Sequence, residues 1–168
     1  MKKYLFVLVV TAVMAAGAVS LTLTKETLSL YEKDPSDWSI VQDGAWGCMQ
    51  YRPEYKTFAF WFGAMYLEPC TDYTLIYYPD QDPAIPDWHW GAGLICLGEG
   101  TTDGDGRIHI CGTPDTGDLP KAYDWNSGAK IWLVLSSDVD CDNQVMTAWN
   151  PTEYLFEGDL ITFDDWDD

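Results

Sequence analysis

Alternation of large aromatic residues with other side chains constrains the fold of this chain more than any other feature. In segment 57–62, phenylalanine occupies every second position, which is the period of an extended strand. From Trp38 onward, similar short runs are separated by turns rich in Gly, Pro, Asp and Asn, and no convincing helix exceeds two turns. About seven or eight such strands predict an all-β fold, an antiparallel β-sandwich with immunoglobulin/fibronectin-III-like or jelly-roll topology.

The first twenty residues have the composition of a secretory signal peptide. Lys2 and Lys3 precede an apolar run, and small residues follow it, so that cleavage after Ala18 or Ser20 is expected. A retained membrane anchor is the alternative, although the run is shorter than the roughly 20 residues that span a bilayer. The sequence therefore predicts a secreted or cell-surface protein with no stable membrane span after signal cleavage.

The remaining chain is long enough for one domain with a real core. We expect residues 1–20 to be the signal peptide and residues 21–168 to form a single β-sandwich domain. Within it, 21–37 is interpreted as an N-terminal leader segment, with a helix turn or a strand as alternatives, and 164–168 as an acidic tail.

Acidic residues dominate the charge of the chain, with 27 Asp and Glu against nine Lys and Arg and a net charge of −18. Such a surface repels nucleic acid, because phosphate binding needs a basic footprint. Hydrophobic residues make up 47% of the chain, which excludes intrinsic disorder.

Five cysteines, which can pair outside the cytoplasm, suggest two disulfides and one free thiol. The runs 93–99 and 107–111 read as a hairpin. With its tip at Asp103-Gly104, Cys96 would face Cys111 at disulfide distance, whereas a tip at Asp105-Gly106 would break that match. We therefore predict a Cys96–Cys111 disulfide and, second, a Cys48–Cys70 disulfide.

The order Leu-x-Pro-x-Thr-x-Tyr-x-Leu over residues 67–75 resembles the corner of fibronectin-III and immunoglobulin-like sandwiches. In those domains a tyrosine hydroxyl folds back onto the preceding turn. Tyr73 is predicted to have this structural role.

Several longer stretches resemble a family of uncharacterised secreted β proteins found mainly in methanogenic archaea and in some bacteria. The matching stretches cover most of the chain after the signal peptide: 30–35, 43–47, 71–79, 94–98, 130–136 and 149–156. The resemblance implies an archaeal type of extracellular or envelope protein and supplies no catalytic residue. Cys48, Cys70 and Cys111 depart from the family pattern.

One acidic loop has the residue types of a cation site. Asp138, Asp140 and Asp142 alternate in sequence, and carboxylate oxygens are the ligands that Ca²⁺ prefers. The loop is not an EF-hand, since Asn143 and Trp149 stand where that motif has Gly and Glu. A candidate calcium site and a simple solvated turn are both compatible with this pattern; no other cofactor is expected.

A second candidate site is Trp88-His89-Trp90, in a loop rich in Pro and Asp. Aromatic faces bind the apolar faces of sugar rings, so these residues are a candidate ligand-binding platform. A tryptophan pair that closes one end of the core is the alternative.

Motifs of enzymes are missing from the sequence, including Gly-x-Ser-x-Gly, His-Glu-x-x-His and phosphate-binding glycine loops. We therefore expect a non-catalytic protein that is a structural or assembly component of the envelope, such as a surface layer, sheath, filament or adhesive coat. Its partners would be copies of itself or envelope components. A secreted carbohydrate- or calcium-binding module is the alternative, and a small hydrolase is a more distant one.

Overall fold

A computed structural model describes residues 24–80 and 92–166 of the chain. These residues form antiparallel β-sheets with two short 3-10 helices, which confirms the all-β prediction. No helix in the described part is long and apolar enough to cross a membrane. The elements are β1 (Glu26–Tyr31), β2 (Trp46–Tyr51), β3 (Glu54–Tyr55), β4 (Phe60–Met65), β5 (Asp72–Tyr78), β6 (Ile95–Thr101), β7 (Ile108–Gly112), β8 (Lys130–Leu135), η1 (Ser136–Asp138), β9 (Val139–Asp140), β10 (Val145–Met146), η2 (Pro151–Glu153), β11 (Phe156–Glu157) and β12 (Asp164–Asp165).

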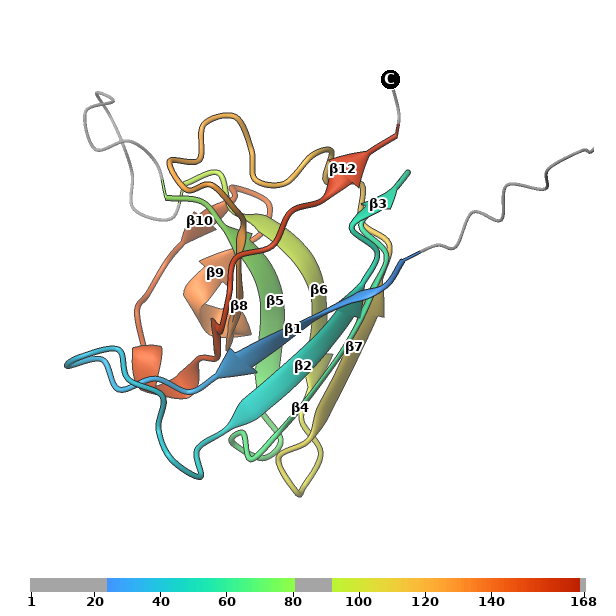
Figure 1. Ribbon diagram of the computed structural model, residues 1–168. Coiled ribbons are helices and arrows are strands. Elements are labelled where there is room, and N and C mark those ends of the chain that lie inside the picture. Colours follow the sequence, from blue (N-terminus) through green and yellow to red (C-terminus); the bar gives the residue numbers. More distant parts are fainter. Residues whose placement is uncertain (1–23, 81–91, 167–168) are drawn as a thin grey trace, which may run out of the picture.

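Two larger sheets build the molecule. One has five strands in the order β11-β1-β2-β4-β7, and the other has three in the order β6-β5-β8. Figure 1 shows the five-stranded sheet in front of the three-stranded one. Two minor sheets pair β9 with β10 in antiparallel fashion and β3 with β12 in parallel.

Side chains from both larger sheets share one core. The alternating phenylalanines Phe58, Phe60 and Phe62 are buried, as the period of two predicts. They meet Leu75 and Leu133, which come from the three-stranded sheet. The apolar alternation therefore sets which face of each strand points inward.

The opposite side of four strands of the five-stranded sheet, which we call the outer face, has an unusual composition. None of its side chains is Asp, Glu, Lys or Arg. Its members are Thr27, Ser29 and Tyr31 of β1, Trp46, Cys48 and Gln50 of β2, Trp61, Gly63 and Met65 of β4, and His109 and Cys111 of β7.

The predicted leader contributes a strand to the sheet of its own chain. Glu26–Tyr31 forms β1, which pairs with β2 on one side and with β11 on the other. Leu28 and Leu30 are two residues apart, so they point to the same face of this strand, and both are buried. At the other end, Asp164–Asp165 of the predicted acidic tail forms β12, whose first N–H donates to the carbonyl of Pro53.

The chain between β6 and β7 turns at Asp103–Gly106. The carboxylate of Asp103 accepts hydrogen bonds from the N–H groups of Asp105 and Arg107, both at 2.9 Å. Gly106 has a φ of +70°, and a Cβ there would lie 2.2 Å from the carbonyl oxygen of Leu67, so only glycine fits. The chain then enters a different sheet, so that β6 and β7 do not pair and Cys96 does not lie opposite Cys111.

The predicted Cys96–Cys111 disulfide is wrong. Beyond the turn, β7 joins the five-stranded sheet, where Cys111 lies opposite Trp61 of β4. Cys96 instead forms a disulfide with Cys141, in the turn between β9 and β10, with a Cα–Cα distance of 5.7 Å.

The predicted Cys48–Cys70 disulfide is also absent, because both thiols are free, as is that of Cys111. Cys48 belongs to the outer face in the middle of β2, whereas Cys70 lies in an exposed turn before β5. These separate locations prevent pairing.

Candidate functional site

A cleft of about 330 Å³ opens beside the end of β5, the start of β8 and β11, and we call it the aromatic cleft. Its walls combine five aromatic rings with two lysines and two carboxylates. The lining residues are Lys33, Trp38, Tyr78, Asp80, Lys130, Trp132, Trp149, Phe156 and Glu157.

A tight hairpin between β1 and β2 presents Trp38 at this cleft. Lys33 and Ile40 form an isolated antiparallel bridge that closes the hairpin. Within it, the carboxylates of Asp34 and Asp37 each accept an N–H two residues further on, which is the Asx-turn chemistry of aspartate. These local hydrogen bonds fix the backbone around Trp38, whose φ is 61°.

Buried rings form the floor of the cleft. Tyr78 and Trp132 stack at a centroid distance of 3.9 Å and an interplanar angle of 15°. Phe156 meets Trp132 edge-on at 5.2 Å. All three side chains are buried in the cluster that covers the outside of the three-stranded sheet, so the floor is rigid.

Two tryptophans above this floor remain open to solvent. Trp38 is 49% exposed and Trp149 is 39% exposed, and their centroids lie 6.3 Å apart at 47°. Trp38 also packs edge-on against Phe156 at 5.2 Å. The two indoles therefore present tilted apolar surfaces at the mouth of the cleft.

Fixed charges line the same space. The ammonium group of Lys130 is paired with the carboxylate of Asp80. Lys33 donates to the carbonyl oxygen of Glu157 at 2.8 Å, and the indole N–H of Trp132 donates to the Glu157 carboxylate. Hydrogen-bond donors and acceptors are thus held in place beside the exposed rings.

Burial raises the pKa of Glu157 above its ordinary value near 4.5. A backbone hydrogen bond, the charges of Lys33 and Lys130 and the hydrogen bond from Trp132 oppose this rise without cancelling it. The ionised carboxylate is consequently more costly in the folded protein than in the unfolded chain.

The free energy of unfolding should therefore fall as the pH rises from about 4.5 through the raised pKa of Glu157. The sign follows because an acid with a raised folded pKa binds its proton more tightly when folded, and this stabilisation is lost on ionisation. Glu157→Gln keeps an acceptor for Trp132 and removes the titration, so urea unfolding at several pH values should show a flatter profile than the wild type. Glu99→Gln, at an exposed position, should leave the profile unchanged; equal profiles for Glu157→Gln and the wild type would contradict this.

The aromatic cleft has the chemistry of a carbohydrate site. Sugar rings present C–H faces that pack on indoles, and hydroxyl groups that need both donors and acceptors. Ligand sites in general combine apolar walls with a few well-placed polar groups.

The candidate calcium loop is arranged differently from the sequence-based hypothesis. Asp138 is buried, and its carboxylate accepts hydrogen bonds from Ser137, from Asn150 at 2.8 Å and from the hydroxyl of Tyr154. This carboxylate therefore anchors the segment leading to β11. If this carboxylate were removed, its donors inside the protein would be left unpaired, which costs free energy of folding.

Asp140 ends β9, and Asp142 lies in the turn that follows. Asp140 accepts two hydrogen bonds from Asn143, at 2.9 Å and 2.7 Å, which lower its pKa. Among the residues that the structure describes, no three His, Cys, Asp or Glu side chains converge as a metal-binding group.

The proposed platform Trp88, His89 and Trp90 lies outside the described residues. The described residue nearest to it on the N-terminal side is Asp80, which lines the aromatic cleft.

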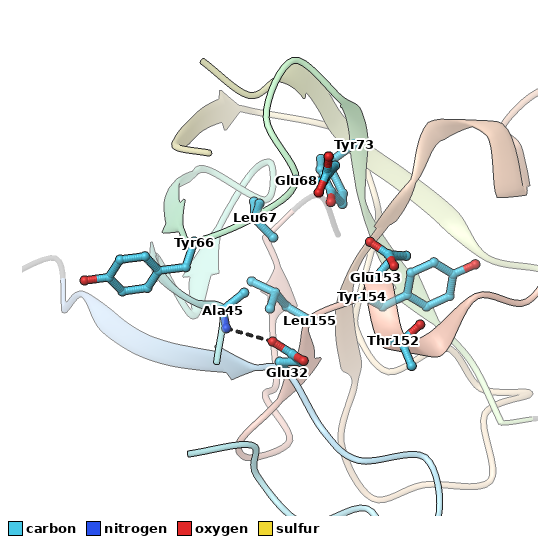
Figure 2. Close-up of a pocket in the computed structure, with 10 residues that line it drawn as sticks. All are labelled: Glu32, Ala45, Tyr66, Leu67, Glu68, Tyr73, Thr152, Glu153, Tyr154 and Leu155. Carbon is cyan, nitrogen blue, oxygen red and sulfur yellow. Dashed lines mark hydrogen bonds between the residues drawn. The ribbon is translucent and has the colours of Figure 1, made fainter. Parts of the chain in front are cut away.

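Figure 2 shows another pocket, of about 190 Å³, near the corner that contains Tyr73. Its carboxylates include Glu32, which accepts the N–H of Ala45 at 2.9 Å. Tyr73 is buried; burial raises its pKa, and a backbone hydrogen bond with Glu68 opposes the rise. This pocket lacks the exposed indoles and paired lysines of the aromatic cleft, which is therefore the stronger candidate.

The sequence pattern did not reveal the aromatic cleft, because its residues come from segments far apart in the chain. Trp38 and Trp149 stand alone in their loops, without a flanking motif. Aspartates at Asp34 and Asp37, which form the turns holding Trp38, were the one local signal.

Comparisons with known proteins add no relative from which a ligand could be transferred. A scan of protein-family models and searches of curated proteins and of solved structures found no match to this chain.

Proposed function

We propose that this protein is a non-catalytic, secreted or cell-surface carbohydrate-binding module whose ligand occupies the aromatic cleft. The observation that carries the proposal is the pair of exposed indoles of Trp38 and Trp149 over a buried aromatic floor. A sugar ring packs on these indoles, and its hydroxyl groups meet the charged groups around them.

Binding is favoured over hydrolysis by the state of the two carboxylates. Asp80 is engaged by Lys130, and Glu157 by the indole N–H of Trp132. A two-carboxylate hydrolase needs one acid free to protonate the leaving group and one base or nucleophile free to attack.

A sandwich architecture would suit this role. We propose that the five-stranded and three-stranded sheets are the two layers of an immunoglobulin/fibronectin-III-like or jelly-roll β-sandwich. The core that side chains of both sheets share supports this.

Export through the signal peptide of residues 1–20 remains our proposal for localisation. The Cys96–Cys141 disulfide is compatible with an oxidising compartment.

Isothermal titration with a panel of soluble neutral and acidic oligosaccharides tests the proposed function. Saturable heat with at least one sugar is expected, and its absence across the panel would contradict the proposal. A parallel titration with Ca²⁺ tests the loop at Asp138, Asp140 and Asp142, where saturable binding would support the calcium hypothesis.

Assembly in the envelope, through self-association or through other envelope components, is a second candidate function. It is favoured by the exposed free thiols of Cys70 and Cys111, which could cross-link neighbouring subunits. Non-reducing electrophoresis of protein from intact cells should show covalent oligomers that disappear in a Cys70→Ser/Cys111→Ser variant. A single monomeric band from wild-type cells would argue against cross-linked assembly.

A further inference from the structure

The strand positions of the outer face carry no acidic or basic side chain, in a protein that has 27 acidic residues and a net charge of −18. Lys25 and Arg52 border the face beside Gln50 and Trp61. Most of its side chains are polar, small or aromatic, and two are large exposed indoles. Trp46 is 41% exposed and Trp61 is 45% exposed. Exposed apolar surface of this kind marks a binding surface more often than a chance exposure does.

Trp61 lies along the sheet over a glycine. A Cβ at Gly63 would be 3.0 Å from the indole atom Cη2 of Trp61 and 3.2 Å from Nδ1 of His109. The rings of Trp61 and His109 are 5.5 Å apart, with an interplanar angle of 32°. The absent side chain at Gly63 thus leaves room for the indole to spread over the strand.

The second indole lies at a distance that suits a polymer. Trp61 of β4 pairs with Gln50 of β2, and Trp46 lies four residues before Gln50 on β2. At the rise of an extended chain, Trp46 is therefore about 14 Å from this pair along the strand. One sugar unit cannot cover both rings, whereas a linear chain crossing the face can. Gln50 lies between Thr27 and Trp61 in the same row, and its side-chain amide can bond the hydroxyl groups of the sugar chain.

We propose that a neutral polysaccharide chain binds across the outer face and stacks on Trp61 and Trp46. Neutrality follows from the charge distribution, since the strand positions of the face hold no fixed charge for an ionic ligand and the net charge of −18 disfavours an acidic polymer. The Trp61 end of the face is separate from the aromatic cleft. Trp61 lies in the row of Thr27, and Thr27 is six residues from Lys33, or about 20 Å in an extended strand. The Trp46 end is nearer to the cleft, because Trp46 pairs with Tyr31 and Tyr31 with Phe156.

The test measures depletion of the purified protein from solution by insoluble neutral polysaccharides, namely microcrystalline cellulose, chitin, xylan and β-1,3-glucan. We expect retention by at least one of them and a loss of about tenfold in affinity for Trp61→Ala. Trp125→Ala is the matched control, because Trp125 is 68% exposed on a different loop. Gly63→Ala should also weaken retention, since its Cβ displaces the indole while Trp61 is still present.

Four results would overturn the proposal: no retention by any of these polymers, equal retention of Trp61→Ala and Trp125→Ala, full retention of Gly63→Ala, or equal retention of the wild type by polygalacturonate. A wild-type dimer that Trp61→Ala converts to monomer, without retention on polysaccharide, would instead identify the face as a self-interface. Thermal unfolding of each variant establishes that it is folded. Trp38→Ala in the aromatic cleft should leave retention unchanged, which separates failure of this proposal from failure at the cleft.

Discussion

Replacing Trp38 by alanine is expected to weaken oligosaccharide binding at the aromatic cleft by about tenfold or more. Half of this indole is exposed, and it faces Trp149 across the cleft mouth. Loss of one stacking surface removes about 1.4 kcal/mol, the equivalent of a factor of ten in Kd. Isothermal titration with the best ligand of the panel measures the change directly.

The fold should survive this substitution. Backbone and Asx-turn hydrogen bonds at Asp34 and Asp37 hold the hairpin, and they do not involve the indole. Trp125→Ala is again the matched control, since it removes an even more exposed indole that does not line the cleft. The backbone N–H of residue 125 donates to the carbonyl of Asp80, and this substitution leaves that bond in place. Equal Kd values for Trp38→Ala, Trp125→Ala and the wild type would show that the ligand binds elsewhere.

Removing the disulfide should have the largest effect on stability. Cys96 and Cys141 are 45 residues apart in sequence, and closing a loop of that length restricts the unfolded chain by about 4 kcal/mol. A Cys96→Ser/Cys141→Ser variant should lose most of this amount. Urea unfolding under oxidising conditions, with the midpoint and slope fitted separately, gives the difference.

Cys111→Ser supplies the discriminating control for that measurement. Its thiol is free and exposed, so the substitution should leave the free energy of unfolding within about 0.5 kcal/mol of the wild type. Should Cys111→Ser cost as much as Cys141→Ser, the pairing Cys96–Cys111 would be the one present in solution.

Local pattern was sufficient to predict the strand that contains the alternating phenylalanines. The phenylalanines of segment 57–62 stand at every second position, and all of them point to the buried face of β4 and of the residues just before it. The Leu28 and Leu30 alternation could equally have shown that the supposed leader is a strand. Its density of Thr, Lys and Glu obscured that signal, because those residues face solvent on the other side or lie at the strand end.

Pairing between strands was beyond what local pattern could predict. The sequence correctly suggested a turn near residues 102–106, but the predicted pairing of the strands on either side is wrong. The exact turn depends on the close approach of Gly106 to Leu67, a residue distant in sequence. That turn sends β6 and β7 to different sheets. The partner of Cys96 was therefore decided by the sheet arrangement rather than by the hairpin.

The role of Asp138 illustrates the same limit for the candidate sites. Three alternating aspartates in one loop look equivalent in the sequence, yet burial separates them. Asp138 accepts the hydroxyl of Tyr154 inside the protein, whereas Asp142 is exposed. Which carboxylate points inward depends on residues 150–154, which arrive from further along the chain.

The position of β1 between β2 and β11 has a consequence for how the chain folds. One neighbour of this N-terminal strand is made of Phe156 and Glu157, so the five-stranded sheet cannot be completed until nearly the whole chain is available. A nascent or truncated chain that ends before Leu155 would leave one edge of β1 unpaired and the bridge to β8 unmade. Such an open edge is a template for pairing with other chains, and Phe156 and Glu157 cover it at Leu30 and Tyr31 once they are in place.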